Sequence, residues 1–157
     1  MNITYRKATL DDLQILVKTR IKVLCIINEL TDSIDMTRVE NASKDYYLGN
    51  LASENHIGYL IFDGDTFVGT GGISFYQVMP TYSNPTGKKA YIMNMYTRQE
   101  YRRKGIASQT LTILLNEARI RGITSIGLEA TEMGRNMYIK FGFVSSADEM
   151  HLSCLNE

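Results

Sequence analysis

The spacing of apolar positions predicts a strand followed by two helices in the first third of the chain. Residues 3–7 alternate between apolar and polar, as in a strand with one buried face. Over residues 13–29 the apolar residues recur at helical spacing, and residues 36–51 predict a second helix. Arg20 interrupts the first apolar stripe. It either marks the edge of the stripe, which is the reading we favour, or faces a polar cleft.

A hairpin and a further strand are predicted in the middle of the chain. Residues 57–62 and 66–70 are strand-like and flank Asp63-Gly64-Asp65, a turn in which the glycine can adopt a positive φ. The second strand of the hairpin continues to Tyr76. A loop that contains both prolines follows over residues 78–87, and residues 90–97 predict the next strand.

The clearest helix in the chain is predicted over residues 105–121. Gly122 is well placed to end this helix with a left-handed cap. A short buried strand is predicted over residues 123–130, a last helix over residues 132–141 and a final strand over residues 150–155. The apolar face of the clearest helix consists of Ala107, Leu111, Leu114, Leu115 and Ala118.

The order of these elements indicates the fold class. The strand, helix and strand over residues 90–130 form a crossover unit, which joins parallel neighbours in a sheet, whereas the hairpin joins antiparallel ones. The predicted class is therefore α/β, or α+β by a stricter definition, with a mixed sheet. A chain of 157 residues fits a single domain, which we place over residues 1–157.

Composition argues against several classes of partner. Lys plus Arg and Asp plus Glu each number 17, so no global charge favours nucleic acid or an anionic membrane. No apolar run approaches the roughly 20 residues of a membrane helix, and the first residues lack the layout of a signal peptide. Cys25 and Cys154 form neither a disulfide framework nor a zinc ligand set. We therefore expect a soluble, cytoplasmic protein without a metal.

The segment Tyr101-Arg-Arg-Lys-Gly-Ile-Ala-Ser108 lies between a predicted strand and the clearest helix. Its small residues let a bulky anion approach the backbone, where the first N–H groups of a helix lack intrahelical partners. Arg102, Arg103 and Lys104 supply counter-charge. This pattern favours a phosphate or pyrophosphate, although Gly105 could equally start a helix beside a solvated basic run. The chain contains neither the P-loop motif nor the glycine spacing of a dinucleotide fold.

Two motifs in this order resemble the GNAT (Gcn5-related) N-acetyltransferase family. The first is Arg102-x-x-Gly105-x-Ala107, within residues 91–107, and the second is residues 128–143, which end in Tyr138-x-x-x-Gly-Phe. The predicted order of elements agrees with that family along nearly the whole chain. The resemblance implies the acyl-CoA N-acyltransferase fold, a mostly antiparallel sheet in which strands 4 and 5 are parallel and splay apart. It also implies acetyl-CoA as cosubstrate.

The resemblance assigns cofactor contacts mainly to backbone groups. Met95, Tyr96 and Thr97 would bind the pantetheine arm and polarise the acetyl carbonyl, one N–H there acting as an oxyanion donor. Thr131 stands where many relatives place an asparagine that bonds the arm; the alternative is that its hydroxyl caps the last helix. The pyrophosphate would be held at Arg102, Arg103, Lys104, Gly105, Ile106, Ala107 and Ser108.

Tyr138 and Glu129 are the catalytic candidates. Tyr138 matches the general acid of the family, which protonates the departing thiolate; without the motif it would be assigned to the core. Glu129 matches a position at which some relatives carry a catalytic glutamate, or it pairs with a nearby cation. Arg135 could reach a phosphate or a substrate carboxylate, or pair with Glu132. His56 and His151 are expected to be ordinary surface histidines.

These features predict transfer of an acetyl group from acetyl-CoA to a primary amine of a small molecule, by direct attack in a ternary complex. The alternatives are a non-catalytic acyl-CoA-binding sensor and a phosphate-binding regulator without CoA. The first two helices and the loop over residues 80–88 would select the acceptor, and their tyrosines favour a small amine. No nucleic acid or membrane is expected as a partner, and a homodimer stays open. The tyrosines are Tyr46, Tyr47, Tyr76 and Tyr82.

Overall fold

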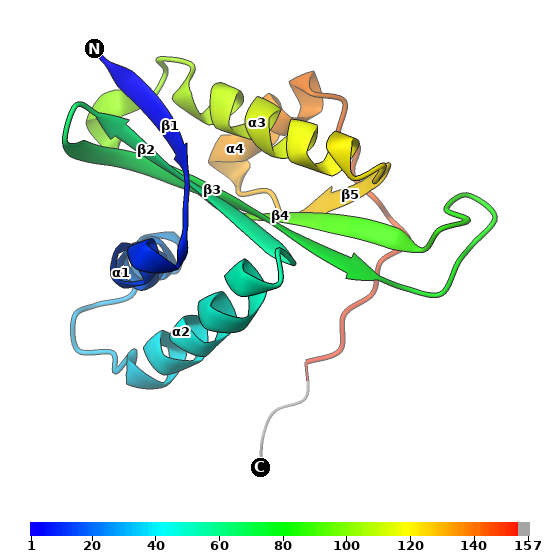
Figure 1. Cartoon of the computed structure of the whole chain (residues 1–157), viewed down its shortest axis with the longest axis horizontal. Coiled ribbons are helices and arrows are strands. Elements are labelled where there is room, and N and C mark those ends of the chain that lie inside the picture. The colour runs from blue at the N-terminus through cyan, green and yellow to red at the C-terminus, as the bar shows by residue number, and fades with distance from the viewer. Residues whose placement is uncertain (154–157) are drawn as a thin grey trace.

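The computed structural model, described for residues 1–153, is built around a five-stranded sheet (Figure 1). Its strands follow the order of the chain, β1-β2-β3-β4-β5. Neighbouring strands are antiparallel except for β4 and β5, which are parallel because α3 crosses over between them. The strands are β1 (Ile3–Lys7), β2 (His56–Asp63), β3 (Thr66–Gln77), β4 (Lys88–Thr97) and β5 (Ser125–Leu128).

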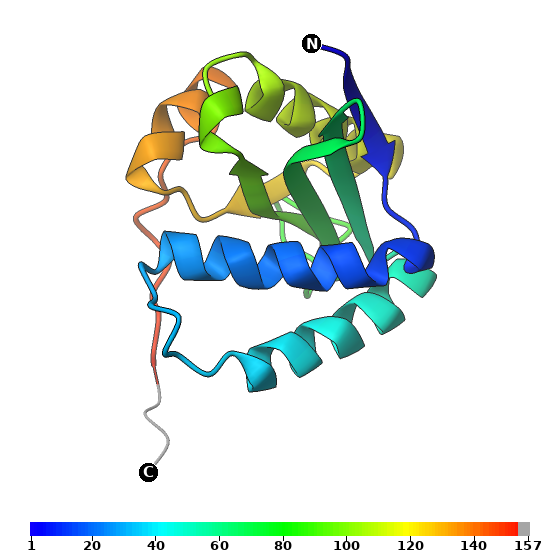
Figure 2. The same cartoon turned by 90° about the vertical axis from the view of Figure 1, so that its left-hand side faces the viewer.

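Two helices cover each face of the sheet. The pair α1 (Leu13–Ile27) and α2 (Thr37–Ala52) lies on one side, and the pair α3 (Ile106–Ile120) and α4 (Glu132–Lys140) lies on the other (Figures 1 and 2). Short 3-10 turns, η1 (Leu10–Asp12) and η2 (Gln99–Tyr101), precede α1 and follow β4. The predicted α/β class, with a mixed and mostly antiparallel sheet, is confirmed.

Each face of the sheet has its own hydrophobic core. On the α3 side, the apolar face of the helix packs on the central strands through Leu111, Leu114 and Ala118, which are fully buried. On the other side, Leu16 and Tyr47 from α1 and α2 pack on β2. The sheet therefore separates two packed layers, and each layer can carry its own part of a site.

Two predicted strands differ from the structure. Strand β5 is shorter than residues 123–130, because the N–H of Ile123 is used to close the end of α3 on the carbonyl of Ala118. The left-handed cap at Gly122 is confirmed by its φ of 66°. The prediction of a final strand over residues 150–155 is wrong for residues 150–153, which form no strand; residues 154–157 lie outside the described part.

Strand β4 carries an irregularity at its centre. In the register with β3, Gly72 pairs with Met93 and Thr70 pairs with Tyr96, so β4 has one extra residue opposite Gly71. Asn94 absorbs it with a φ of 57°, a conformation that asparagine tolerates better than most residues. The bulge breaks the strand's alternation. Met93 lines the pocket beside α1 and α2, whereas the sulfur of Met95 lies over Gly71 on the α3 side.

Candidate functional site

A gap between β4 and β5 begins where their pairing ends. The last paired residues are Ile92 and Leu128, whereas β4 continues through Thr97. The N–H of Arg98 bonds to the carbonyl of Val68 on β3 at 2.9 Å, so strand alternation turns the backbone groups of Thr97 toward the gap. The splay of strands 4 and 5 that the sequence resemblance implies is therefore present.

The start of α3 presents a run of backbone N–H groups without partners. Gly105, with a φ of 81°, precedes the helix, and Arg103 has a φ of 60°. Among the described residues, no hydrogen-bond acceptor is found for the backbone N–H groups from Arg103 to Ser108. These donors converge with the positive end of the helix dipole, which is the arrangement that binds phosphate groups. A pyrophosphate therefore fits this turn.

The basic side chains of the turn do not all act as mobile counter-charge. The Nε of Arg102 donates to the carbonyl of Thr97 at 3.1 Å, and its Nη1 contacts the sulfur of Met133 at 3.7 Å. Arg102 therefore links β4 to the cradle and to α4. The ammonium of Lys104 lies 5.2 Å from the ring centre of Tyr101, and Arg103 is exposed. Arg103 therefore matches the expectation of a mobile counter-charge better than Arg102, whose guanidinium contacts Thr97 and Met133.

Tyr138 lies at the edge of the core beside the gap. Its side chain is 8% exposed and packs edge-on against Phe143, with ring centres 5.9 Å apart, in the cluster that holds Ile92 and Leu128. Gly134, one turn earlier, leaves room for the ring, since a Cβ there would lie 3.2 Å from it. Among the described residues its hydroxyl has no hydrogen-bond partner, and burial raises its pKa above the usual 10. The hydroxyl therefore stays protonated at neutral pH.

Glu129 and Thr131 follow β5 directly. Glu129 is exposed, and alternation turns it to the face opposite Leu128, beside Tyr91. Burial, and then the charge of Glu129, raise the pKa of the Tyr91 hydroxyl. The hydroxyl of Thr131 accepts the N–H of Gly134 at 3.2 Å and caps α4. The cap role that the sequence left open for Thr131 is therefore present.

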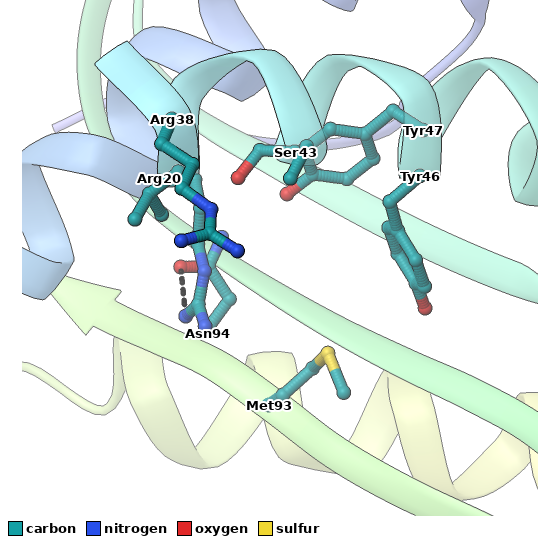
Figure 3. Close-up of a pocket in the computed structure, with 9 residues that line it drawn as sticks. Arg20, Arg38, Ser43, Tyr46, Tyr47, Met93 and Asn94 are labelled. Carbon is teal, nitrogen blue, oxygen red and sulfur yellow. Dashed lines mark hydrogen bonds between the residues drawn. The ribbon is translucent and has the colours of Figure 1, made fainter. Parts of the chain in front are cut away.

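A pocket of about 630 Å³ opens on the other face of the sheet, between α1, α2 and β4 (Figure 3). Arg20 reaches into it from α1, and its Nη1 lies 3.5 Å from the Oδ1 of Asn94 at the bulge. The favoured expectation, that Arg20 marks the edge of the apolar stripe, is wrong: its side chain lines this pocket. The pocket is lined by Arg20, Arg38, Val39, Ala42, Ser43, Tyr46, Tyr47, Met93 and Asn94.

His56 is buried behind this pocket, contrary to the expectation of a surface histidine. Its Nδ1 lies 3.1 Å from the hydroxyl of Tyr46 and 3.0 Å from the hydroxyl of Ser74, its cross-strand partner. Burial, and then the charge of Arg20, lower its pKa to about 4, so the ring is neutral at pH 7. The missing signal was the register of β2 and β3, which places Gly72 against the ring and makes room for it.

The other candidates from the sequence divide between the pocket and the surface. Tyr46 and Tyr47 line the pocket, whereas Tyr76 and Tyr82 are exposed and do not. Arg135 donates to the hydroxyl of Ser145 at 3.2 Å, and the described structure shows no ion pair with Glu132. His151 is exposed, as expected. Among residues 1–153 no group of side chains could hold a metal ion, and no helix is long and apolar enough to span a membrane.

The fold and the cradle agree with a known class of protein. The sequence matches the model of the acetyltransferase (GNAT) family over residues 27–143. Since this match covers most of the chain, the protein belongs to the GNAT acetyltransferase family. No curated protein sequence matches the chain.

Solved structures support the same assignment. A predicted acetyltransferase from Clostridium acetobutylicum, solved with acetyl-CoA, is 34% identical, with a TM-score of 0.88 and 96% of each chain covered. A GCN5-related N-acetyltransferase from Ralstonia eutropha JMP134 is 24% identical, with a TM-score of 0.82, over 96% of this chain and 98% of the other. A possible acetyltransferase from Clostridium difficile 630 shares the fold over the full length of both chains, at 19% identity and a TM-score of 0.75.

Proposed function

We propose that the protein transfers the acetyl group of acetyl-CoA to the primary amine of a small molecule, in a ternary complex. The observation that carries this proposal is the gap beside β4, which has the N–H cradle of α3 at one end and the pocket of Arg20 on the opposite face. A cofactor that enters the gap from the cradle would bring its acyl end next to the bulge at Asn94. Asn94, at this bulge, also lines the pocket.

The cofactor contacts would come mostly from the main chain. The N–H groups from Arg103 to Ser108 would bind the pyrophosphate, and the main chain at Met95, Tyr96 and Thr97, which has no pairing with β5, would bind the pantetheine arm and polarise the acetyl carbonyl. Arg102 would act indirectly, by holding Thr97 in place. When bound, acetyl-CoA supplies an activated acetyl thioester.

The protein's side chains would manage two protons. The hydroxyl of Tyr138 would donate a proton to the departing thiolate, because its raised pKa keeps it protonated. Strand alternation would turn Glu129 to the face opposite Leu128, where it would accept the proton of the attacking amine, directly or through water. The acid and the base would thus act from opposite faces of the gap.

Two measurements test this proposal in sequence. Isothermal titration with acetyl-CoA should give a saturable signal, and absence of binding at about 1 mM would refute the acyl-CoA assignment. Release of free thiol from acetyl-CoA should then be measured with a panel of primary amines. Acetyl-CoA binding without thiol release for any amine would favour the non-catalytic sensor. The pocket beside the bulge favours the enzyme, because a sensor of acyl-CoA alone has no need of it.

A further inference from the structure

The pocket between α1, α2 and β4 contains two arginines and no acid. Arg20 and Arg38 are the only charged residues that line it, and neither forms an ion pair with any described residue. Figure 3 shows both side chains directed into the space between α2 and β4, on the side of Asn94. Two cations that share a partly enclosed space repel each other, and this arrangement is stabilised when an anion binds between them.

Each arginine occupies a position that folding alone does not favour. Arg20 lies in the inward stripe of α1, one helical turn after the buried Leu16 and Val17, where an apolar residue would pack better. Arg38 lies in the first turn of α2, where the helix dipole disfavours a cation. Neither position is explained by the packing of the free protein, which points to a ligand that uses the two charges.

The rest of the pocket suits a small organic molecule. Its volume of about 630 Å³ falls in the range of ligand sites. Val39, Ala42 and Met93 supply apolar walls, and the hydroxyls of Ser43 and Tyr47 face the same space (Figure 3). The charge of Arg20 also reaches inward. Burial lowers the pKa of His56 and Arg20 lowers it further, whereas burial raises the pKa of Tyr47 to about 12 and Arg20 opposes this rise. No carboxylate of the described chain neutralises the charge of Arg20 there.

We propose that Arg20 and Arg38 bind an oxyanion, a carboxylate or a phosphate, of the acceptor, so that the substrate is a small amine that also carries an acidic group. This inference rests on the proposed acetyl transfer and names the substrate class for it. The guanidinium groups would hold the oxyanion through paired hydrogen bonds, and the amine would lie toward the bulge at Asn94. Arg20 and Arg38 then select the acceptor and take no part in the proton transfers.

The test uses matched pairs of probes on the CoA-saturated protein. Standard amino acids and 4-aminobutyrate are compared with their amides, and O-phosphoethanolamine with ethanolamine, by isothermal titration. At least one anionic probe should bind roughly tenfold or more tightly than its neutral partner. Amino acids and phosphoethanolamine distinguish a carboxylate from a phosphate. The proposal is overturned if no anionic probe exceeds its neutral partner.

Three variants locate the effect. Arg20→Gln and Arg38→Gln should each lower the affinity for the preferred probe about tenfold. Arg20→Lys should recover only part of this affinity, because an ammonium cannot form the bidentate hydrogen bonds of a guanidinium. Lys22→Gln removes an exposed charge from the same helix as Arg20 and should change nothing. Equal probe binding by the wild type and both glutamine variants would contradict the proposal. Acetyl-CoA titration of the same variants should be unchanged; failure of the wild type in that titration would refute acetyl transfer instead.

Discussion

The two faces of the sheet differ in the kind of chemical group that they offer to the gap beside β4. On the α3 side the offered groups are backbone N–H donors, held by a glycine turn and a helix start. On the α1 side they are side chains, among them Arg20, Arg38 and Tyr46. A backbone cradle suits a ligand that never changes, whereas a side-chain pocket can be altered by substitution without changing the fold. Under the proposed function, this division would separate the cosubstrate, on the α3 side, from the acceptor, on the α1 side.

The largest expected effect is on kcat, from substitution of Tyr138, the proposed acid on the α3 side of the sheet. Tyr138→Phe removes the proposed acid and should lower kcat by roughly 10²- to 10⁴-fold near pH 7, with acetyl-CoA affinity nearly unchanged. The raised pKa of Tyr138 predicts that no loss of activity from its ionisation occurs below pH 10. Tyr82→Phe, at an exposed tyrosine, is the matched control. Unchanged thiol release by Tyr138→Phe would exclude the acid role.

The buried His56 makes the stability of the protein sensitive to acid. Its pKa lies near 4 in the folded protein and near 6.5 in the unfolded chain, so only the unfolded state gains a proton as the pH falls from 6.5 to 4. The contribution of neutral His56 is therefore complete above pH 6.5. When the pH reaches 4, up to about 3 kcal/mol of the unfolding free energy is lost.

Urea unfolding at pH 7 and at pH 4.5 measures this effect. The wild-type protein should lose more unfolding free energy than His56→Gln over this interval, because all other titrating groups are common to both proteins. Equal losses in the two proteins would show that His56 titrates normally, and that Tyr46 and Ser74 do not enclose it.

An acidic substitution at the start of α3 tests cofactor binding separately from helix stability. Ser108→Glu places an acid in the first turn, where the dipole favours it, but next to the N–H groups that would hold a pyrophosphate. Acetyl-CoA affinity should fall about tenfold while the melting temperature stays equal or rises slightly. Gln109→Glu adds the same charge at an exposed position of the next turn and should bind normally. Similar affinities for both variants would refute the cradle.

The smallest effect distinguishes two roles of Thr131. If its hydroxyl serves only as the cap of α4, Thr131→Ala should cost about 1 kcal/mol, or about 3 °C in melting temperature, with acetyl-CoA affinity unchanged. A loss of affinity beyond about threefold would mean that the same hydroxyl also contacts the pantetheine arm. Thr112→Ala, at an exposed threonine of α3, controls for general effects of the substitution.

Sequence and structure agree best where local signals are strong. The cradle could be predicted because a glycine turn, a basic run and a long amphipathic helix are adjacent in the chain. The pocket between α1, α2 and β4 could not be predicted, because Arg20, Arg38 and Met93 come from three separate elements. They meet only through the packing of α1 and α2 on the sheet. Periodicity placed Arg20 at a stripe edge, since it reports burial on one helix and not what the helix faces.

The remaining differences depend on pairing between strands. His56 was assigned to the surface because its cover comes from Gly72 and Ser74 on the neighbouring strand, and register cannot be derived from alternation within one strand. The end of β5 at Leu128 is likewise set by the loss of its partner on β4. No pattern of apolar residues marks a strand that stops because its neighbour diverges.

The extra residue at Asn94 has a consequence for how this strand can change over time. Because the bulge reverses the phase of β4, Met93 faces the pocket between α1, α2 and β4, and Met95 faces the α3 layer. Deletion of Asn94 would restore a regular strand and leave Met93 and Met95 on their present faces, so the extra residue sets the local bend of β4 and not which side chains face each layer. A chain without Asn94 would therefore keep its two packed layers but lose the bulge beside which the pocket opens.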